Sequence, residues 1–249
     1  MKNWQKYAAE AFGTFVVVGI GGGVMMGLSN NIEMFPDDGV IFFALAPLLV
    51  ALAFGFAWIA ALYTVGRISG GHFNPVLSLA AFLDRAISAK DTLFYWVAQF
   101  VGAIGAIGFF AWLFSADTTA GARNFFLEFP EGAPISFNAF KAFSVEAVLT
   151  LILTVAFLTL LRSQAHTKWL GMGFTLFAVT LLGWGVTTAG VNPARALAPA
   201  LFSGEWGDIW VYFAGPIVGA IAGWVLYRII VRGDTNLVDD LGEIADSVT

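Results

Sequence analysis

Two Asn-Pro pairs stand out in a sequence with few polar side chains. They are Asn74-Pro75, in the stretch SGGHFNPV, and Asn192-Pro193, in GVNPAR. Asn is a favoured helix N-cap, and Pro is tolerated in the first turn because its missing N–H would have no partner there. Each pair therefore predicts a helix start with an amide side chain at its tip. These amide side chains can form hydrogen bonds with a neutral solute.

Other chemistry-bearing groups are scarce. The chain has no cysteine and only two histidines, which leaves little material for thiol chemistry or a metal centre. No set of nucleophile, base and oxyanion donors is apparent, so an enzyme is not expected, and neither is a metal or a cofactor. The basic residues are scattered and form no stripe, which argues against a nucleic-acid partner.

The composition is that of an integral membrane protein. Of the 249 residues, 59% are hydrophobic and 12% are charged, and the mean hydropathy is +0.81. About 20 apolar residues of helix cross a bilayer core. Six runs have that length, and their only acids are Glu10 and Glu146. The runs are 7–28, 40–65, 92–115, 142–161, 169–191 and 209–228.

The distribution of Lys and Arg predicts the orientation. With six spans both termini lie on one side, and that side holds nine of the twelve basic residues. Short loops rich in Lys and Arg stay in the cytoplasm. In the lipid bilayer that the hydropathy predicts, both termini are therefore expected to be cytoplasmic. The brevity of the loops favours a prokaryotic plasma (inner) membrane.

Two apolar pieces, 75–83 and 193–202, are too short to span and each follows an Asn-Pro pair. The chain also repeats itself: AEAFGT at 9–14 matches VEAVLT at 145–150, and QFVGA at 99–103 matches PIVGA at 216–220. Three spans per copy give an inverted-topology repeat. We predict an all-α membrane protein with six transmembrane helices and two re-entrant half-helices. It forms one domain, 1–233, with halves at about 1–116 and 140–233, followed by an acidic cytoplasmic tail, 234–249.

The segments SGGHF and TTAGV lead into the two half-helices and are expected to be non-helical. Non-helical backbone at membrane depth is tolerated only where protein buries it or where it lines a water-filled cavity. We therefore expect these two segments to line such a cavity. Two half-helices meeting at their N-termini would concentrate positive potential near the midplane. Cations, protons included, would be repelled, whereas a neutral solute bound by Asn74 and Asn192 would pass. This pattern favours a channel.

These features together resemble the aquaporin, or major intrinsic protein, family, specifically its water-channel branch with an atypical first motif, NPV. The resemblance covers nearly the whole chain. It implies passive, proton-excluding permeation of water through one pore per subunit of a homotetramer. Glycerol, ammonia and urea are candidate further solutes.

The resemblance also implies residue roles. Asn74 and Asn192 become midplane donors. Glu10 and Glu146 become acceptors for the loop N–H groups, with a proton relay as the alternative. The outer selectivity filter matches Phe54, Thr180, Ala189 and Arg195. Backbone carbonyls along the pore come from Gly70, Gly71, His72, Thr188, Ala189 and Gly190, and the motif positions are Pro75, Val76, Pro193 and Ala194.

Several of these positions have other interpretations. Phe54 is otherwise a core residue and Arg195 an interfacial anchor. The side chain of His72 is expected to pack in the loop or to line the vestibule, with a pH gate as the alternative. Water-selective relatives have His where this chain has Thr180, so a wider constriction is expected here. Val76 replaces the family's Ala and is expected to pack against Pro193 as a tolerated variant.

Two rival functions stay open at this stage. An ion-coupled secondary transporter can also be built from inverted repeats, but it would need carboxylates facing the cavity. A membrane structural or adhesion protein would conduct little.

Overall fold

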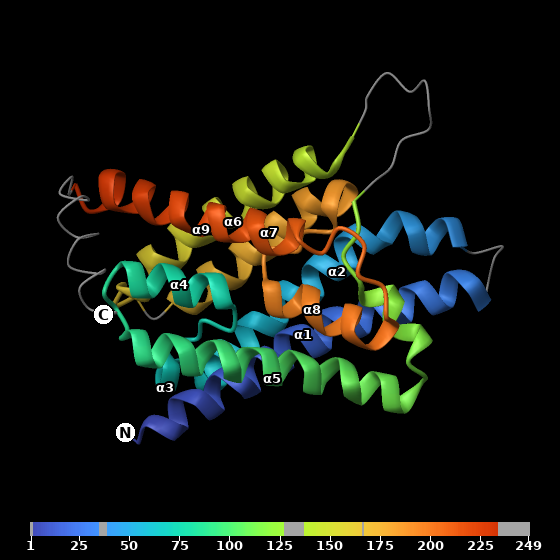
Figure 1. The fold of residues 1–249 in the computed structure, drawn as a ribbon, viewed down its shortest axis with the longest axis horizontal. Helices are drawn as coiled ribbons and strands as arrows, with labels where there is room; N and C mark the ends of the chain where they lie inside the picture. Colours follow the sequence, from blue (N-terminus) through green and yellow to red (C-terminus); the bar gives the residue numbers. More distant parts are fainter. Residues whose placement is uncertain (1, 35–38, 127–136, 166, 234–249) are drawn as a thin grey trace.

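The computed structural model describes residues 2–34, 39–126, 137–165 and 167–233 (Figure 1). The predicted tail 234–249 lies outside the described residues. Six long helices dominate, and each is long and apolar enough to cross a membrane. They are α1 (Asn3–Met34), α2 (Gly39–Ala61), α5 (Ala89–Leu113), α6 (Ala139–Leu161), α7 (Lys168–Thr187) and α9 (Val211–Leu226). The predicted count of six is confirmed.

Short elements complete the described chain. A π-helical turn, η1 (Leu62–Gly66), and α3 (Arg67–Ser69) extend α2, while η3 (Tyr227–Val231) extends α9. A 3-10 helix, η2 (Asp117–Ala122), packs against α1 and α8.

The two half-helices begin where the Asn-Pro pairs predict. These are α4 (Pro75–Leu83) and α8 (Pro193–Ser203). The side-chain oxygen of Asn74 accepts a hydrogen bond from the N–H of Val76 at 3.1 Å, and that of Asn192 accepts one from Ala194 at 3.0 Å. These bonds satisfy N–H groups that have no partner within the first helical turn. The predicted fold class is confirmed.

The halves of the molecule pack in matching ways. In the first half α1 lies against α2 and α5, and in the second α6 lies against α7 and α9. The half-helices cross over, since α4 contacts α9 and α8 contacts α5. In Figure 1, α4 lies in the part of the molecule nearer the termini and α8 in the opposite part.

Glycine permits the closest helix contacts. A Cβ added at Gly102 on α5 would stand 2.2 Å from the carbonyl oxygen of Ala11 on α1. One added at Gly219 on α9 would stand 2.2 Å from that of Ala147 on α6. Both glycines lie in the repeated motifs QFVGA and PIVGA. The repeat therefore conserves a backbone-to-backbone packing that no side chain could enter.

The fifth apolar run, 169–191, includes the lead-in TTAGV (187–191), which the sequence predicts to be non-helical. In agreement with this, α7 ends at Thr187, because Thr188 adopts a left-handed conformation with φ of 56°. Hydropathy could not reveal this end, since the following loop is itself apolar and buried.

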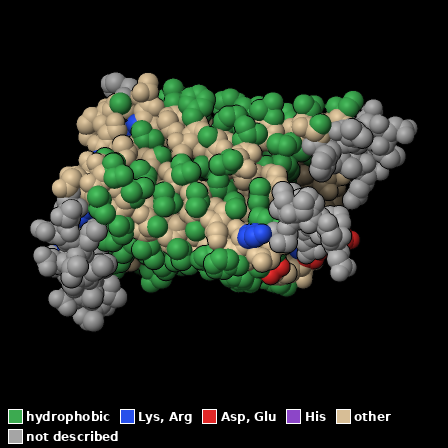
Figure 2. Space-filling view, turned by 90° about the horizontal axis from the view of Figure 1, so that it is seen from above, with side chains coloured by type: hydrophobic (Ala, Val, Ile, Leu, Met, Phe, Trp, Pro, Cys, Tyr) green, Lys and Arg blue, Asp and Glu red, His purple; other side chains and the backbone are tan. Residues whose placement is uncertain are grey.

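The surface of the molecule suits a bilayer. Hydrophobic side chains cover the middle of the face in Figure 2, and the acidic side chains visible there lie near one end. Many large apolar side chains on the long helices are exposed, for example Phe12, Ile20, Val101 and Leu182. In Figure 1 the start of α1 and the end of the last helix lie at the same end of the molecule.

Candidate functional site

Two loops of matching shape lead into the half-helices. Gly70, Gly71 and Phe73 have positive φ of 96°, 70° and 46° in the first loop. The second loop repeats the pattern 118 positions later, at Thr188, Ala189 and Val191, with φ of 56°, 48° and 43°. A β-branched residue in this region is strained, because its Cβ crowds the backbone. Tertiary contacts must therefore hold the second loop in shape.

A buried carboxylate holds each loop. Glu10 accepts hydrogen bonds from the N–H groups of His72 (3.0 Å) and Phe73 (2.7 Å) and from the hydroxyl of Ser69 (2.6 Å). Gln99 also donates to it, at 2.7 Å. These bonds give partners to N–H groups that would otherwise be buried without one.

Glu146 repeats this arrangement in the second half. It accepts hydrogen bonds from the N–H groups of Gly190 (2.9 Å) and Val191 (2.6 Å) and from the hydroxyl of Thr187 (2.5 Å). Both Glu10 and Glu146 are fully buried. Their contacts are those expected of loop acceptors, and neither carboxylate lines the cavity described below.

The two asparagines reach across to each other's loop. Nδ2 of Asn74 donates to the carbonyl of Val191 at 2.9 Å, and Nδ2 of Asn192 donates to that of Phe73 at 3.0 Å. A primary amide has two N–H donors. Each Asn therefore keeps a second N–H beyond this bond, and both side chains line one cavity.

That cavity brings all four predicted filter residues together with both asparagines. Phe54, Thr180, Ala189 and Arg195 are each at most 4% exposed and all line it. It leaves about 10 Å³ for the centre of a water-sized molecule, roughly the space that one water needs. The space beside Thr180 is narrow, and the widening expected from its replacement of a His stays a prediction.

Arg195 is fixed by several contacts. Its Nη2 donates to the carbonyl of Thr188 at 3.1 Å and lies 3.3 Å from the sulfur of Met25, while its guanidinium lies 4.8 Å from the ring centre of Phe54. Its Nη1 is buried and has no hydrogen-bond partner among the described residues. A solute in the cavity can supply that partner.

The predicted pore carbonyls differ in their surroundings. The carbonyl of Thr188 accepts from Arg195, and that of Gly71 accepts from the indole N–H of Trp58 at 3.4 Å. For Gly70, His72, Ala189 and Gly190 a role in the pore stays a prediction.

The side chain of His72 is enclosed by aromatic rings. Its ring centre lies 5.0 Å from those of both Tyr95 and Phe157, and Nδ1 lies 3.1 Å from the hydroxyl of Ser78. The side chain is 1% exposed. This enclosure favours a packing role over a pH gate.

The motif residues Pro75, Val76, Pro193 and Ala194 are all buried. Val76 is 2% exposed within the main core. The expected effect of Val76 on Pro193 stays a prediction.

Sequence reasoning missed part of the cavity wall. Val17, Trp58 and Leu176 also line it. Trp58 follows Phe54 by four residues, and residues at that spacing share one face of a helix. Leu176 precedes Thr180 by four. This spacing was the signal that could have found both.

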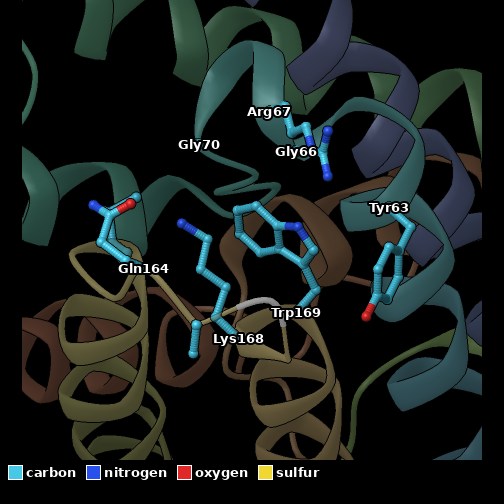
Figure 3. Close-up of a pocket in the computed structure, with 9 residues that line it drawn as sticks. Tyr63, Gly66, Arg67, Gly70, Gln164, Lys168 and Trp169 are labelled. Atoms are coloured by element: carbon cyan, nitrogen blue, oxygen red, sulfur yellow. The ribbon is translucent and has the colours of Figure 1, made fainter.

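A wider pocket of about 360 Å³ is shown in Figure 3. Arg67, which lines it, belongs to α3, and α3 lies near the N-terminus in Figure 1. Tyr63, Arg67, Gly70, Lys168 and Trp169 are among its lining residues. Lys168 lies over the ring of Trp169, 4.5 Å from its centre. Gly70 belongs to the first re-entrant loop, so this pocket opens beside that loop, and we refer to it as the inner vestibule.

An ion-pair cluster anchors the far end of α4. Asp84, the C-cap of α4, is buried and accepts hydrogen bonds from Arg162 Nε at 2.9 Å and Arg232 Nη1 at 3.2 Å. The hydrogen bond that Arg162 donates to Asp84, together with the negative charge of Asp84, raises the pKa of Arg162, which follows α6. The half-helix is thus tied at one end to the second half of the chain.

Comparison with known proteins agrees with this geometry. Residues 1–227 match the family described as Major intrinsic protein. Aquaporin Z of Brucella melitensis biotype 1 is 32% identical and covers 92% of this chain and 99% of its own. Nodulin-26 of Glycine max is 32% identical, covering 94% of this chain and 80% of its own. The aquaglyceroporin structure from Plasmodium falciparum has the same fold, with a TM-score of 0.74 at 20% identity over 96% of this chain and 99% of that one.

The fold and the paired half-helices define a membrane channel, not an enzyme. The chain belongs to the major intrinsic protein family, as the resemblance of its two Asn-Pro motifs predicts.

Proposed function

We propose that this protein conducts water passively and excludes protons. The observation that carries the proposal is the single cavity lined by both Asn side chains, Arg195 and Phe54, with space for about one water. A lining that combines hydrogen-bond donors with apolar side chains, around space for about one water, favours water molecules that pass in single file.

The half-helix termini support proton exclusion. α4 and α8 both begin at the cavity, and each helix N-terminus carries roughly half a positive charge. The guanidinium of Arg195 adds a full positive charge to the same narrow space. A hydronium ion would meet repulsion there and would lose its hydration, whereas a neutral water molecule meets no such repulsion and can accept hydrogen bonds from the donors.

The size of the cavity limits other solutes. Thr180 supports admission of molecules larger than water, but the space beside it does not favour glycerol or urea. Ammonia, which is close to water in size, fits the cavity best of the three further solutes. We therefore propose water as the principal substrate.

Reconstituted vesicles test this proposal. Stopped-flow shrinkage of proteoliposomes against an impermeant osmolyte should give a water permeability well above that of empty vesicles. A glycerol gradient should give little flux, and an internal pH dye should detect no proton flux. Thr180→His should reduce glycerol entry more than water flux if any glycerol passes. Water permeability equal to that of empty vesicles would refute the channel assignment and favour a structural or adhesion role.

The same vesicles separate the channel from an ion-coupled transporter. Coupling would require a carboxylate in the cavity wall, and none of the described lining residues is acidic. Imposing a pH gradient should therefore leave water and solute flux unchanged. Uptake driven by the gradient would favour the transporter.

We also propose a plasma (inner) membrane location with both termini cytoplasmic, supported by the Lys and Arg distribution. The chain has no cysteine, so single cysteines report orientation cleanly. In intact cells an impermeant maleimide should label Ser115→Cys and not Gln164→Cys, both of which replace exposed residues. The reverse pattern would invert the topology.

A homotetramer is the assembly we propose, on the strength of the family resemblance. The exposed apolar side chains of the long helices are available for contacts with lipid or with other copies. Native mass spectrometry of the purified protein should give four chains per particle.

A further inference from the structure

We propose that Trp58 forms a second constriction, on the inner side of the filter, and that this constriction sets the size limit of the pore. The inference rests on the proposed function as a water channel. It assigns selectivity to a residue outside the ring of Phe54, Thr180, Ala189 and Arg195.

The position of Trp58 on its helix is the first argument. Phe54 and Trp58 are four residues apart on α2, which places Trp58 about 6 Å further along the helix axis. Both line the narrow cavity. Continuing in the same direction, Tyr63, Gly66 and Arg67 line the inner vestibule. Trp58 thus lies between the filter and the inner vestibule.

The loop facing Trp58 gives the same order. Gly70 lines the inner vestibule and Asn74 lines the narrow cavity. The indole N–H of Trp58 donates to the carbonyl of Gly71, which lies between these two residues in the chain. The indole therefore stands where the narrow cavity would have to join the vestibule.

The indole is also held in place. It is 2% exposed, belongs to the main core, and its one polar atom has the Gly71 carbonyl as a partner at 3.4 Å. Burying an indole N–H usually requires such a partner. This hydrogen bond fixes the orientation of the indole ring. It also uses one acceptor site of the Gly71 carbonyl, which the family resemblance predicts to bind the passing solute.

Trp58 accounts for the narrow cavity beside Thr180. Beside Phe54 and Arg195, the outer ring holds only the smaller side chains of Thr180 and Ala189, yet the cavity has room for about one water. Because the two constrictions are in series, the tighter one decides which solutes pass. A wide outer ring is then compatible with rejection of glycerol.

A graded series of substitutions tests the proposal. Trp58→Phe, Trp58→Leu and Trp58→Val remove successively more of the side chain, and water and glycerol permeabilities are measured in proteoliposomes for each. The ratio of glycerol to water permeability should rise along the series. In Trp58→Val it should reach at least on the order of ten times the wild-type ratio, since even one methylene-sized group changes discrimination by roughly 10–200-fold.

Trp224→Phe is the matched control. Trp224 is 1% exposed in the same core, but it lies on α9 and does not line the narrow cavity. Its substitution perturbs core packing without opening the pore, so the permeability ratio should stay at the wild-type value. A second check is Thr180→His in the Trp58→Val background, which should lower glycerol entry again by narrowing the outer ring.

The outcomes are distinguishable. A permeability ratio that does not change in Trp58→Leu and Trp58→Val, with water flux retained, overturns the second constriction. A rise in Trp58→Phe as large as in Trp58→Val also overturns it, because the aromatic bulk is kept in the former. If Trp58→Val does not assemble, Trp58→Leu decides by the same criterion. Wild-type vesicles without water flux instead overturn the proposed function itself.

Discussion

The side-chain amide of Asn192 donates a hydrogen bond to the carbonyl of Phe73, in the loop of the opposite half, at 3.0 Å. Asn74 does the same toward Val191 at 2.9 Å. The two halves of the chain are therefore joined at the centre by a reciprocal pair of bonds. Each Asn caps its own half-helix with its oxygen and holds the other half's loop with its nitrogen.

This dual role predicts the cost of removing either side chain. Asn192→Ala should lower the free energy of unfolding by about 1 kcal/mol for the lost cap. A further loss of about 1–3 kcal/mol should follow because the buried Phe73 carbonyl loses its donor. Asn74→Ala should behave alike, and water permeability should fall in both.

Asn138 supplies the control for that measurement. It caps α6 by accepting from the N–H of Lys141 at 3.0 Å, but it is exposed. Asn138→Ala should cost only the cap, about 1 kcal/mol, and should leave water flux unchanged. Equal losses for Asn138→Ala and Asn192→Ala in thermal or denaturant unfolding would contradict the cross-loop role.

Glu146→Gln should destabilise the second loop. The carboxylate accepts from three donors, and an amide would turn one of its oxygens into an N–H₂ facing another N–H. We expect a loss of about 1–3 kcal/mol in stability and a lower water permeability with no gain in proton flux. Glu205→Gln, at an exposed acid paired with Arg123, should change stability by less than about 1 kcal/mol. Loss of pH-driven uptake at unchanged stability would instead support the proton-relay hypothesis.

Gly219→Ala should separate α9 from α6. The new methyl group would stand 2.2 Å from the carbonyl oxygen of Ala147, a backbone atom that can yield only if a helix shifts. Overpacking of this kind costs about 1–3 kcal/mol. Gly185→Ala is the control, because that position on α7 faces open space and Ala there should stabilise the helix by about 0.5–1 kcal/mol. A melting temperature of Gly219→Ala at or above that of Gly185→Ala would rule the close contact out.

Asp84→Asn should loosen the C-terminal end of α4. The substitution keeps an acceptor but removes the charge that Arg162 and Arg232 share. Both arginines are more than a third exposed, so the expected loss of stability is modest, about 1 kcal/mol. Water permeability should fall more than in Asp91→Asn, which weakens contacts of Asp91 with Lys6 and Tyr7 between α5 and α1. Unchanged flux in Asp84→Asn would show that α4 holds its position without this anchor.

Much of the fold was open to prediction because its causes are local. Span number follows from apolar length, and each half-helix start follows from an Asn cap and a Pro that act within one turn. The equivalent positions of Glu10 and Glu146 in the two halves could be predicted from the repeated motif. The left-handed conformations of Thr188 and Val191 could not be predicted, because the loop that contains them is held by hydrogen bonds to Glu146, which is distant in the sequence.

By itself the sequence determined the six spans, the two capped half-helices and the inverted repeat, since each depends on hydrophobic length or on hydrogen bonds between near neighbours. The tertiary structure decided which side chains meet at the centre. The bonds from Asn74 and Asn192 to the opposite loops, and the place of Trp58 beside the narrow cavity, join residues brought together only when the two halves pack. The width of the passage is a property of that packing, because the gap between side chains from several helices depends on all of them at once.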